Sequence, residues 1–209
     1  MAALDNALTT LARAKAHLDI SGTTHDSRLT VIIAGVSKFV STYCRRDFKR
    51  QAYTSEEYNG KGQEDIWLKN APVISGQTFT MQRRTSVLNE NDWESIDTEE
   101  YFIDYVPARI RKTFGAWQEG FKNYRFTYTA GFYLPSHANY QDGVDDDQDL
   151  PFDLELAVMD LISGAFNRRK SGGIQSEKVY QIDITYAKEL RDNPMLQQSL
   201  DSYKRMGYA

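Results

Sequence analysis

The sequence predicts an α+β protein that is mainly a helical bundle with a small antiparallel β part. Apolar residues recur at helical spacing near both ends of the chain, whereas short alternating segments fill residues 48–132. The expected order is two N-terminal helices at 4–18 and 27–45, strands, one long central helix at 151–170, and one C-terminal helix. Helices grouped before and after a run of strands are typical of proteins in which helices and an antiparallel sheet are segregated.

The second N-terminal helix has the most regular pattern in the first half of the chain. Asp26 is predicted to cap it by accepting hydrogen bonds from free backbone amides. Arg45 and Arg46 follow its end, where the helix dipole favours positive charge. Its apolar stripe, at spacings of three and four, consists of Leu29, Ile32, Ile33, Val36, Phe39, Val40 and Tyr43.

The β part is predicted from short segments with alternating polarity. In "NYRFTYTAGF" the residues Tyr124, Phe126, Tyr128 and Ala130 share one face, which indicates a half-buried strand. The polar insert at 83–100 is expected to be a long loop or an extended hairpin. The other strand candidates are "QAYTSEEY", "DIWL", "VISGQTFTMQ", "YFIDY" and "ARIRKTF".

The central helix begins with favourable residues and ends in a basic, glycine-containing segment. Pro151 suits an early helical position, and Asp153 and Glu155 suit the first turn. Its predicted core face consists of Leu154, Val158, Leu161, Ile162, Ala165 and Phe166, and Gly172 or Gly173 is expected to cap it. After an extended segment, Asn193 and Pro194 are expected to start the last helix.

Composition excludes several classes of protein. The 209 residues include 25 basic and 29 acidic side chains, a formal net charge of −4, which does not suit a protein that coats nucleic acid. The single cysteine, Cys44, lies on an apolar stripe and is predicted to be a small buried residue. Neither a signal peptide nor a membrane span is expected, so the sequence predicts a soluble protein made in a reducing cytoplasm.

The sequence offers little for catalysis. There is no G-x-S-x-G motif, and the glycines of "NGKGQ" lack a following Lys-Ser or Lys-Thr pair. An acidic loop near His137 contains Asp142, Asp145, Asp146, Asp147 and Asp149, whose spacing matches neither a zinc nor a calcium-loop pattern. We therefore expect no catalytic residue, no metal and no cofactor. A metal-dependent hydrolase that uses the 137–149 loop is the least favoured alternative.

The ordered set of motifs resembles the head–tail connector (adaptor) proteins of long-tailed bacteriophages. The likeness covers roughly residues 8–206 and depends on order and spacing. Its motifs are "VSKFVSTYCRRDF", "YTSEEYNGKGQEDIWLKNAPVIS", "YRFTYTAGF", "LPFDLELAVMDLISGAFNRRKSGGIQSEKVY" and "LQQSLDSYKRMGY". The 83–100 insert and the acidic run at 142–149 look longer than such proteins usually carry.

The resemblance implies a non-enzymatic, structural virion protein of the neck, made in the bacterial cytoplasm. Family members form a ring, usually of twelve copies, under the portal protein. The ring extends the channel through which viral DNA passes without specific binding, and it provides a docking surface for stopper and tail-terminator proteins. Another neck or tail component, such as a stopper or a tail terminator, is the alternative within the same class.

The resemblance also implies a division into an adaptor core at 1–170, which includes the β-rich part, and an arm with a docking helix at 171–209. The docking helix would contact the portal or a neighbouring subunit through Leu196, Leu200, Tyr203 and Met206. The alternative for this helix and for the arm is ordinary packing within their own subunit. The acidic loop would face the channel or a docking partner, or it would simply be solvated. The arm between subunits would hinge at Gly172 and Gly173 and bury Val179, Ile182, Ile184 and Tyr186.

Overall fold

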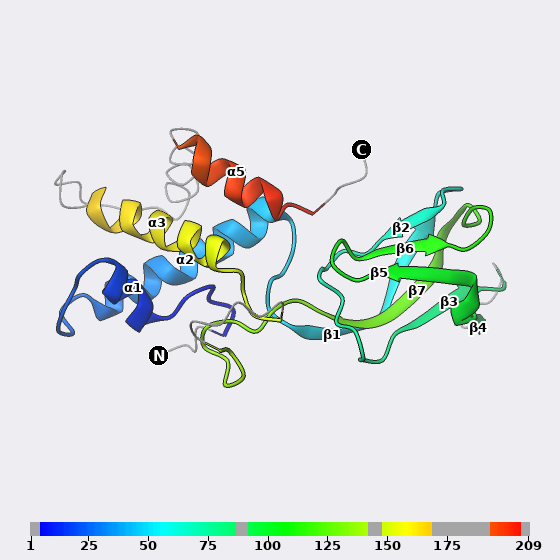
Figure 1. Cartoon of the computed structure of the whole chain (residues 1–209), viewed down its shortest axis with the longest axis horizontal. Helices are drawn as coiled ribbons and strands as arrows, with labels where there is room; N and C mark the ends of the chain where they lie inside the picture. Colours follow the sequence, from blue (N-terminus) through cyan, green and yellow to red (C-terminus); the bar gives the residue numbers. More distant parts are fainter. Residues whose placement is uncertain (1–4, 87–91, 142–147, 169–192, 206–209) are drawn as a thin grey trace. The chain divides into compact units, whose positions relative to one another are not determined.

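The chain folds into two compact units, which are described separately. The computed structural model describes residues 5–86, 92–141, 148–168 and 193–205. One unit is helical and combines Met1–Phe48 with the chain from Tyr133 onward, whereas the other, the β unit, comprises Lys49–Phe132. The helical unit is therefore discontinuous in sequence, with the β unit inserted between its second and third helices (Figure 1).

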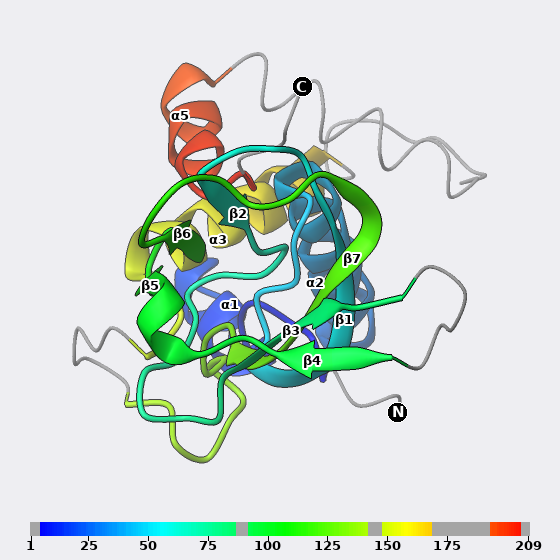
Figure 2. The same cartoon turned by 90° about the vertical axis from the view of Figure 1, so that its right-hand side faces the viewer.

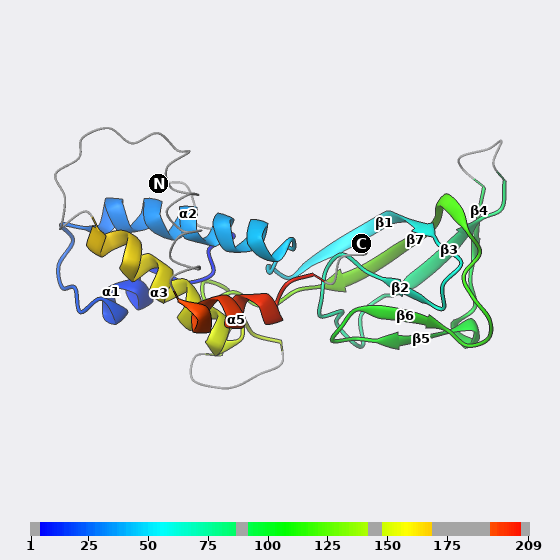
Figure 3. The ribbon, with the colours of Figure 1, turned by 90° about the horizontal axis from the view of Figure 1, so that it is seen from above.

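The helical unit is built around two long helices, α2 and α3. These are α2 at Asp26–Cys44 and α3 at Phe152–Arg168, and they lie side by side (Figures 1 and 3). Two shorter helices, α1 at Leu11–His17 and α5 at Pro194–Ser202, each contact both long helices. The regular apolar stripes explain this arrangement, because each long helix buries one face against the other helices.

The first helix is shorter than predicted, and the second is capped differently. Thr10 accepts a hydrogen bond from the backbone amide of Arg13 at 3.3 Å, so α1 begins after it rather than at residue 4. His25 takes the N-cap position of α2, and Asp26 lies inside the first turn. Its carboxylate is 2.7 Å from Nζ of Lys15 on α1. Asp26 thus joins two helices instead of capping one.

The third helix has the core face that the sequence predicts. Leu154, Val158, Leu161, Ile162 and Phe166 are buried, whereas Ala165, which was also predicted on this face, is only half-buried. The guanidinium of Arg28 on α2 donates to the backbone carbonyl of Phe166 at 2.8 Å and lies over its ring at 4.5 Å. Apolar packing and this contact together hold α3 against α2.

The β unit contains two antiparallel sheets (Figure 2). The four-stranded sheet has the order β1-β7-β3-β4, and the three-stranded sheet has the order β2-β6-β5. A single turn of 3₁₀ helix at Thr98–Glu100 precedes β5. The strands are β1 at Gln51–Gly60, β2 at Asp65–Trp67, β3 at Thr80–Arg84, β4 at Trp93–Ser95, β5 at Tyr101–Asp104, β6 at Arg109–Lys112 and β7 at Gly120–Ala130.

One apolar core fills the β unit, and β7 supplies its centre. Tyr124, Phe126, Tyr128 and Ala130 are buried, as the alternation of the sequence predicts. The core also takes side chains from the three-stranded sheet, including Ile110 of β6. Both sheets therefore cover a common interior.

The two ends of the β unit are joined by backbone contacts. The amide of Arg50 donates to the carbonyl of Phe132 at 2.8 Å, and Lys49 and Phe132 form a bridge. Gly131 has a φ of +101°, and a Cβ there would lie 2.6 Å from the carbonyl oxygen of Lys49. Only glycine permits this close approach, which lets the chain leave the helical unit and return at nearly one point.

The prediction of a mainly helical bundle with a small β part is wrong. The described residues form seven strands in two antiparallel sheets, with 27% strand against 33% helix, so neither class dominates. Several strands are only three or four residues long, and their outward residues are charged, which weakens the alternating signal. The polar 83–100 region contributes β4, because pairing with β3 rather than local hydrophobicity makes it a strand.

Candidate interaction surfaces

The last helix, α5, is packed into the helical unit through one apolar edge. Asn193 caps it by accepting a hydrogen bond from the Leu196 amide at 3.3 Å, and Pro194 occupies the first turn. Leu196 and Leu200 are buried, with exposed fractions of 7% and 0%. The neighbours of α5 are α2 and α3, so these two leucines belong to the core of their own unit.

Polar contacts surround this packed edge of α5. The hydroxyl of Tyr43 on α2 donates to Asp201 at 2.7 Å, and the hydroxyl of Tyr203 donates to Asp153 on α3 at 2.6 Å. The ring of Tyr203 also lies edge-on to Phe48 at 6.5 Å. Because the two tyrosine–aspartate contacts are exposed, each adds less stability than the buried leucines do.

Where α5 packs against α2, charge and burial shift the pKa values of two groups. Hydrogen bonds from Lys204 and from Tyr43 lower the pKa of Asp201. Burial raises the pKa of the Cys44 thiol to about 12, so the group stays neutral and unreactive. Cys44 is buried beside the Leu200 carbonyl, which confirms the prediction of a small buried residue.

The predicted docking residues fall into three different environments. Leu196 and Leu200 are buried, Tyr203 is half-buried, and Met206 lies outside the described residues. The most exposed large apolar residue of α5 is Met195, at 81%. Docking through this helix stays a prediction. The two leucines can reach a partner only if α5 leaves its own unit.

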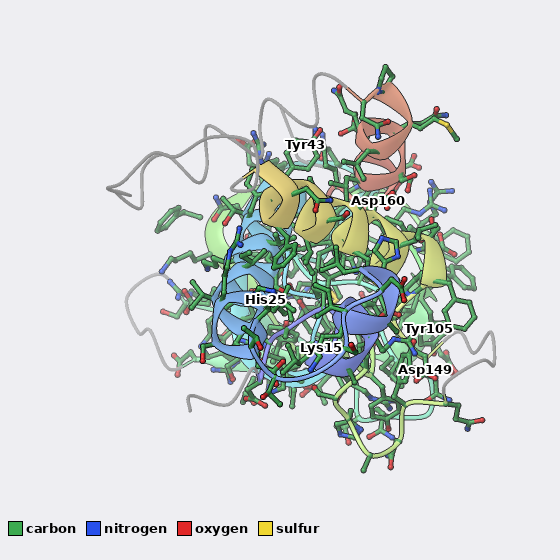
Figure 4. All side chains as sticks on the ribbon, turned by 90° about the vertical axis from the view of Figure 1, so that its left-hand side faces the viewer. Lys15, His25, Tyr43, Tyr105, Asp149 and Asp160 are labelled. Atoms are coloured by element: carbon green, nitrogen blue, oxygen red, sulfur yellow. The ribbon has the colours of Figure 1, made fainter. Side chains whose placement is uncertain are left out.

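The inter-subunit arm and most of the acidic loop lie outside the described residues. This applies to Gly172, Gly173, Val179, Ile182, Ile184 and Tyr186, and to Asp142, Asp145, Asp146 and Asp147. Their roles, and the division of the chain at residue 170, stay predictions. Asp149 is described and is only 4% exposed (Figure 4). Its carboxylate accepts a hydrogen bond from the Gln141 amide at 2.8 Å, so it holds the base of the loop.

A buried carboxylate on α3 joins three parts of the helical unit. Glu155 is 1% exposed and accepts hydrogen bonds from Thr9 at 2.7 Å and from Arg13 at 2.7 Å to each of its oxygens. The hydroxyl of Tyr140 is 3.4 Å away. The sequence prediction assigned Glu155 only to the first helical turn. Its place on the apolar face of α3, between Leu154 and Val158, was the signal for burial.

The β unit has its own polar centre at Glu56 of β1. The hydroxyls of Tyr58 and Tyr128 donate to its carboxylate at 2.5 and 2.7 Å, and Nζ of Lys69 lies 2.9 Å away. Burial disfavours the charged form of Glu56, but the three donors outweigh it and lower its pKa. Burial also raises the pKa of both tyrosines, which keeps them protonated as donors.

Several large apolar side chains of the β unit are exposed. They belong to β5, the β5–β6 turn, and the β6–β7 connection with the start of β7. The sequence prediction missed them, because alternation indicates which face a residue occupies and not whether another sheet covers that face. These residues are Phe102 at 62% exposure, Tyr105 at 41%, Val106 at 77%, Phe114 at 85% and Phe121 at 75%.

Metal-binding geometry is not found in the part of the chain that the structure describes. No group of three or more His, Cys, Asp or Glu side chains there can hold an ion. His137 stacks on Tyr133 at 4.6 Å between ring centroids, and its Nδ1 accepts a hydrogen bond from the Asn139 amide. Among the same residues, no helix has both the length and the apolar character needed to cross a bilayer.

The chain matches a known family in sequence. The family model described as "Phage gp6-like head-tail connector protein" matches residues 8–92, which include α1, α2 and the first strands of the β unit. This match confirms the resemblance to head–tail connector proteins. No curated protein matches the chain in sequence.

Solved structures resemble the chain over nearly its whole length. A chain from the neck of an empty gene transfer agent particle, computed with C6 symmetry, has a TM-score of 0.51 and 14% identity, covering 100% of this chain and 95% of that chain. This likeness supports a shared fold. A chain from the native neck computed with C12 symmetry has a TM-score of 0.49 and 16% identity, with coverages of 100% and 94%.

Proposed function

We propose that the protein is a structural component of the neck, the head–tail interface of a phage or phage-like particle, and that it performs no catalysis. The match of residues 8–92 to the head–tail connector family carries this proposal. The fold shared with a chain from a gene transfer agent neck supports it.

The finer proposal is an adaptor that forms a ring under the portal protein. The neck of the similar chain was computed with C6 symmetry, and we extend ring assembly to this chain on that ground. Twelve copies, a continued DNA channel, and docking of stopper or tail-terminator proteins follow from the family resemblance. The exposed apolar residues of the β unit support a role for this unit in contacts with other proteins, since large apolar anchors are typical of protein interfaces.

Electron microscopy of the protein mixed with its portal tests this proposal, together with mass photometry of the protein alone. We expect a ring stacked on the narrow exit of the portal, and the mass would show whether the ring forms beforehand. Binding to the tail tube instead would favour a stopper or a tail terminator. A failure to bind portal, stopper and tail components would contradict a neck role altogether.

Two variants test the proposed contact segments in the same assay. Replacing Gly173 with proline should reduce ring assembly and leave the thermal stability of the subunit unchanged, because the arm would lose its hinge. Replacing Met195 with aspartate should weaken portal binding, because it places a charge on the most exposed apolar residue of α5. If neither variant changes assembly, the arm and α5 are not the contact segments.

A further inference from the structure

The C-terminal ends of α2 and α5 bring four cationic residues together from distant parts of the chain. The amide of Arg205 donates to the carbonyl of Cys44 at 2.8 Å, so Lys204 and Arg205 follow α5 directly beside Arg45 and Arg46, which follow α2. We call these four residues the basic junction. The whole β unit and α3 separate the two pairs in the sequence, and only the packing of α5 makes them neighbours.

The basic junction has a surplus of positive charge. Two acidic residues, Asp47 and Asp201, lie in segments 43–48 and 200–205, which contain the junction. Asp201 is 2.6 Å from Nζ of Lys204, which also lies 3.9 Å above the ring of Tyr43. The carboxylate of Asp153 on α3 also lies here, 2.6 Å from the Tyr203 hydroxyl, so four cations against three carboxylates leave a local charge of about +1. The formal charge of the whole chain is −4, so this positive charge is a local feature.

Arg45 has a backbone conformation that usually belongs to glycine. It follows α2 with a φ of 55° and a ψ of 39°, in the left-handed region. This conformation crowds a side chain, which is why glycine predominates where helices end in this way. The arginine side chain is exposed. A strained backbone position that keeps a long cationic side chain points to a use for that side chain.

The arginine side chains are held in ways that favour an anionic ligand. The guanidinium of Arg46 lies over the ring of Phe48 at 4.9 Å, which fixes its plane. Nε of Arg205 is buried and has no hydrogen-bond partner among the described residues. A buried donor without an acceptor costs free energy, which an anion would recover once the side chain turns to bring Nε to the surface. Planar guanidinium groups match phosphate oxygens in particular.

We propose that the basic junction binds the phosphate backbone of double-stranded nucleic acid without sequence specificity. A protein partner would need an exposed apolar anchor. No large apolar side chain among the described residues of segments 43–48 and 200–205 is exposed. Tyr43, Phe48 and Tyr203 are all occupied in contacts within the unit. What the junction offers is charge and guanidinium geometry, which suits phosphate contacts.

The inference is independent of assembly, although it would give a neck protein a direct contact with the DNA that passes it. The affinity of one chain should be weak and only modestly dependent on salt, because two to four phosphate contacts release few counterions. Repetition of the junction in an oligomer would strengthen it through multivalency.

Fluorescence anisotropy of a short labelled duplex, titrated with the full chain at several low salt concentrations, tests the proposal. The variants are Arg45→Gly and Arg205→Gln, with Lys61→Ala as a control that removes one exposed charge from the β unit. We expect each junction variant to lower the affinity several-fold and to reduce the slope of log K against log salt by about 0.9 per lost contact. Lys61→Ala should bind as the parent does.

Arg45→Gly separates binding from folding, because glycine suits the left-handed backbone and the variant should melt no lower than the parent. Equal affinity for parent and junction variants would overturn the proposal. A polyglutamate peptide that binds at the junction while the duplex does not would also overturn it, in favour of an acidic protein partner. The same variants in the portal assay keep the two proposals apart, since rings that form without duplex binding would leave the neck role intact.

Discussion

At the scale of single residues, two buried carboxylates organise the protein. Glu155 joins α3 to α1 and to the residues before α1, and Glu56 gathers two tyrosines and a lysine in the β unit. Each is charged, partly or fully buried, and surrounded by donors. A buried charge with all its partners is tolerated, whereas the loss of one partner is costly.

Replacing Glu155 with glutamine should lower the free energy of unfolding by about 2 kcal/mol, because Arg13 and Thr9 lose a charged acceptor. Urea denaturation measures the change. The matched control is Glu94→Gln, which removes the exposed pair between Glu94 and Arg83 at 2.9 Å and should cost no more than about 0.5 kcal/mol. Equal effects of the two variants would show that burial does not increase the contribution of Glu155 to the free energy of unfolding.

Glu56 should make the β unit sensitive to acid. Its pKa is lower in the folded protein than the ordinary value of 4.5, so its contribution to stability is complete above about pH 4.5. That contribution is lost as the pH falls through the folded pKa, since the unfolded chain then binds the proton more readily. Urea midpoints of the parent and of Glu56→Gln should therefore differ most at pH 7 and converge toward pH 3. A difference that is constant with pH would refute this role.

At the scale of elements, α5 joins the helical core and also presents an outward side. Its buried leucines lie against α2 and α3, and its exposed Met195 faces solvent. The short helix has nine residues, too few to be stable in isolation, so its structure depends on this packing. Any partner that binds α5 therefore meets a helix already fixed by its own unit.

Replacing Leu200 with alanine should destabilise the helical unit by about 3 kcal/mol, because it leaves a cavity where the side chain is fully buried. Met195→Ala is the control, and its effect should stay within about 0.5 kcal/mol. Thermal unfolding followed by circular dichroism measures both. A Leu200→Ala protein as stable as the parent would indicate that α5 detaches readily.

At the scale of the whole molecule, one folded unit is inserted into another. The β unit has a closed apolar core, and its first and last residues meet through the bridge of Lys49 and Phe132. The helical unit is formed by residues that precede the inserted β unit together with residues that follow it. A unit with adjacent ends and its own core has what it needs to fold alone.

Residues 49–132 expressed alone should therefore fold into a β protein. We expect dispersed amide signals in NMR and a cooperative thermal transition, because the contacts of its core lie within the segment. Gly131→Ala in the same fragment should be strongly destabilised, since its new methyl would clash with the carbonyl of Lys49. A fragment without dispersed signals would show that the β unit requires the helical unit.

The sequence by itself determined the two long helices and the main strand. Apolar spacing located α2 and α3, and alternation in β7 identified the buried residues Tyr124, Phe126 and Tyr128 correctly. These patterns are local, because each element repeats one face over several turns or residues. The order of motifs also indicated the connector resemblance that the family match confirms.

Only the tertiary structure decided the balance of strand and helix, the inserted β unit and the basic junction. Strand β1 pairs with β7 although β2 to β6 lie between them in the sequence, and Arg205, near the C-terminus, meets Cys44 at the end of α2. The local periodicity of a segment does not indicate such contacts, because it shows which face is apolar and not which distant segment packs against that face. Glu155 shows the same limit, since its place on the apolar face of α3 indicates burial but does not indicate its partners Arg13 and Thr9.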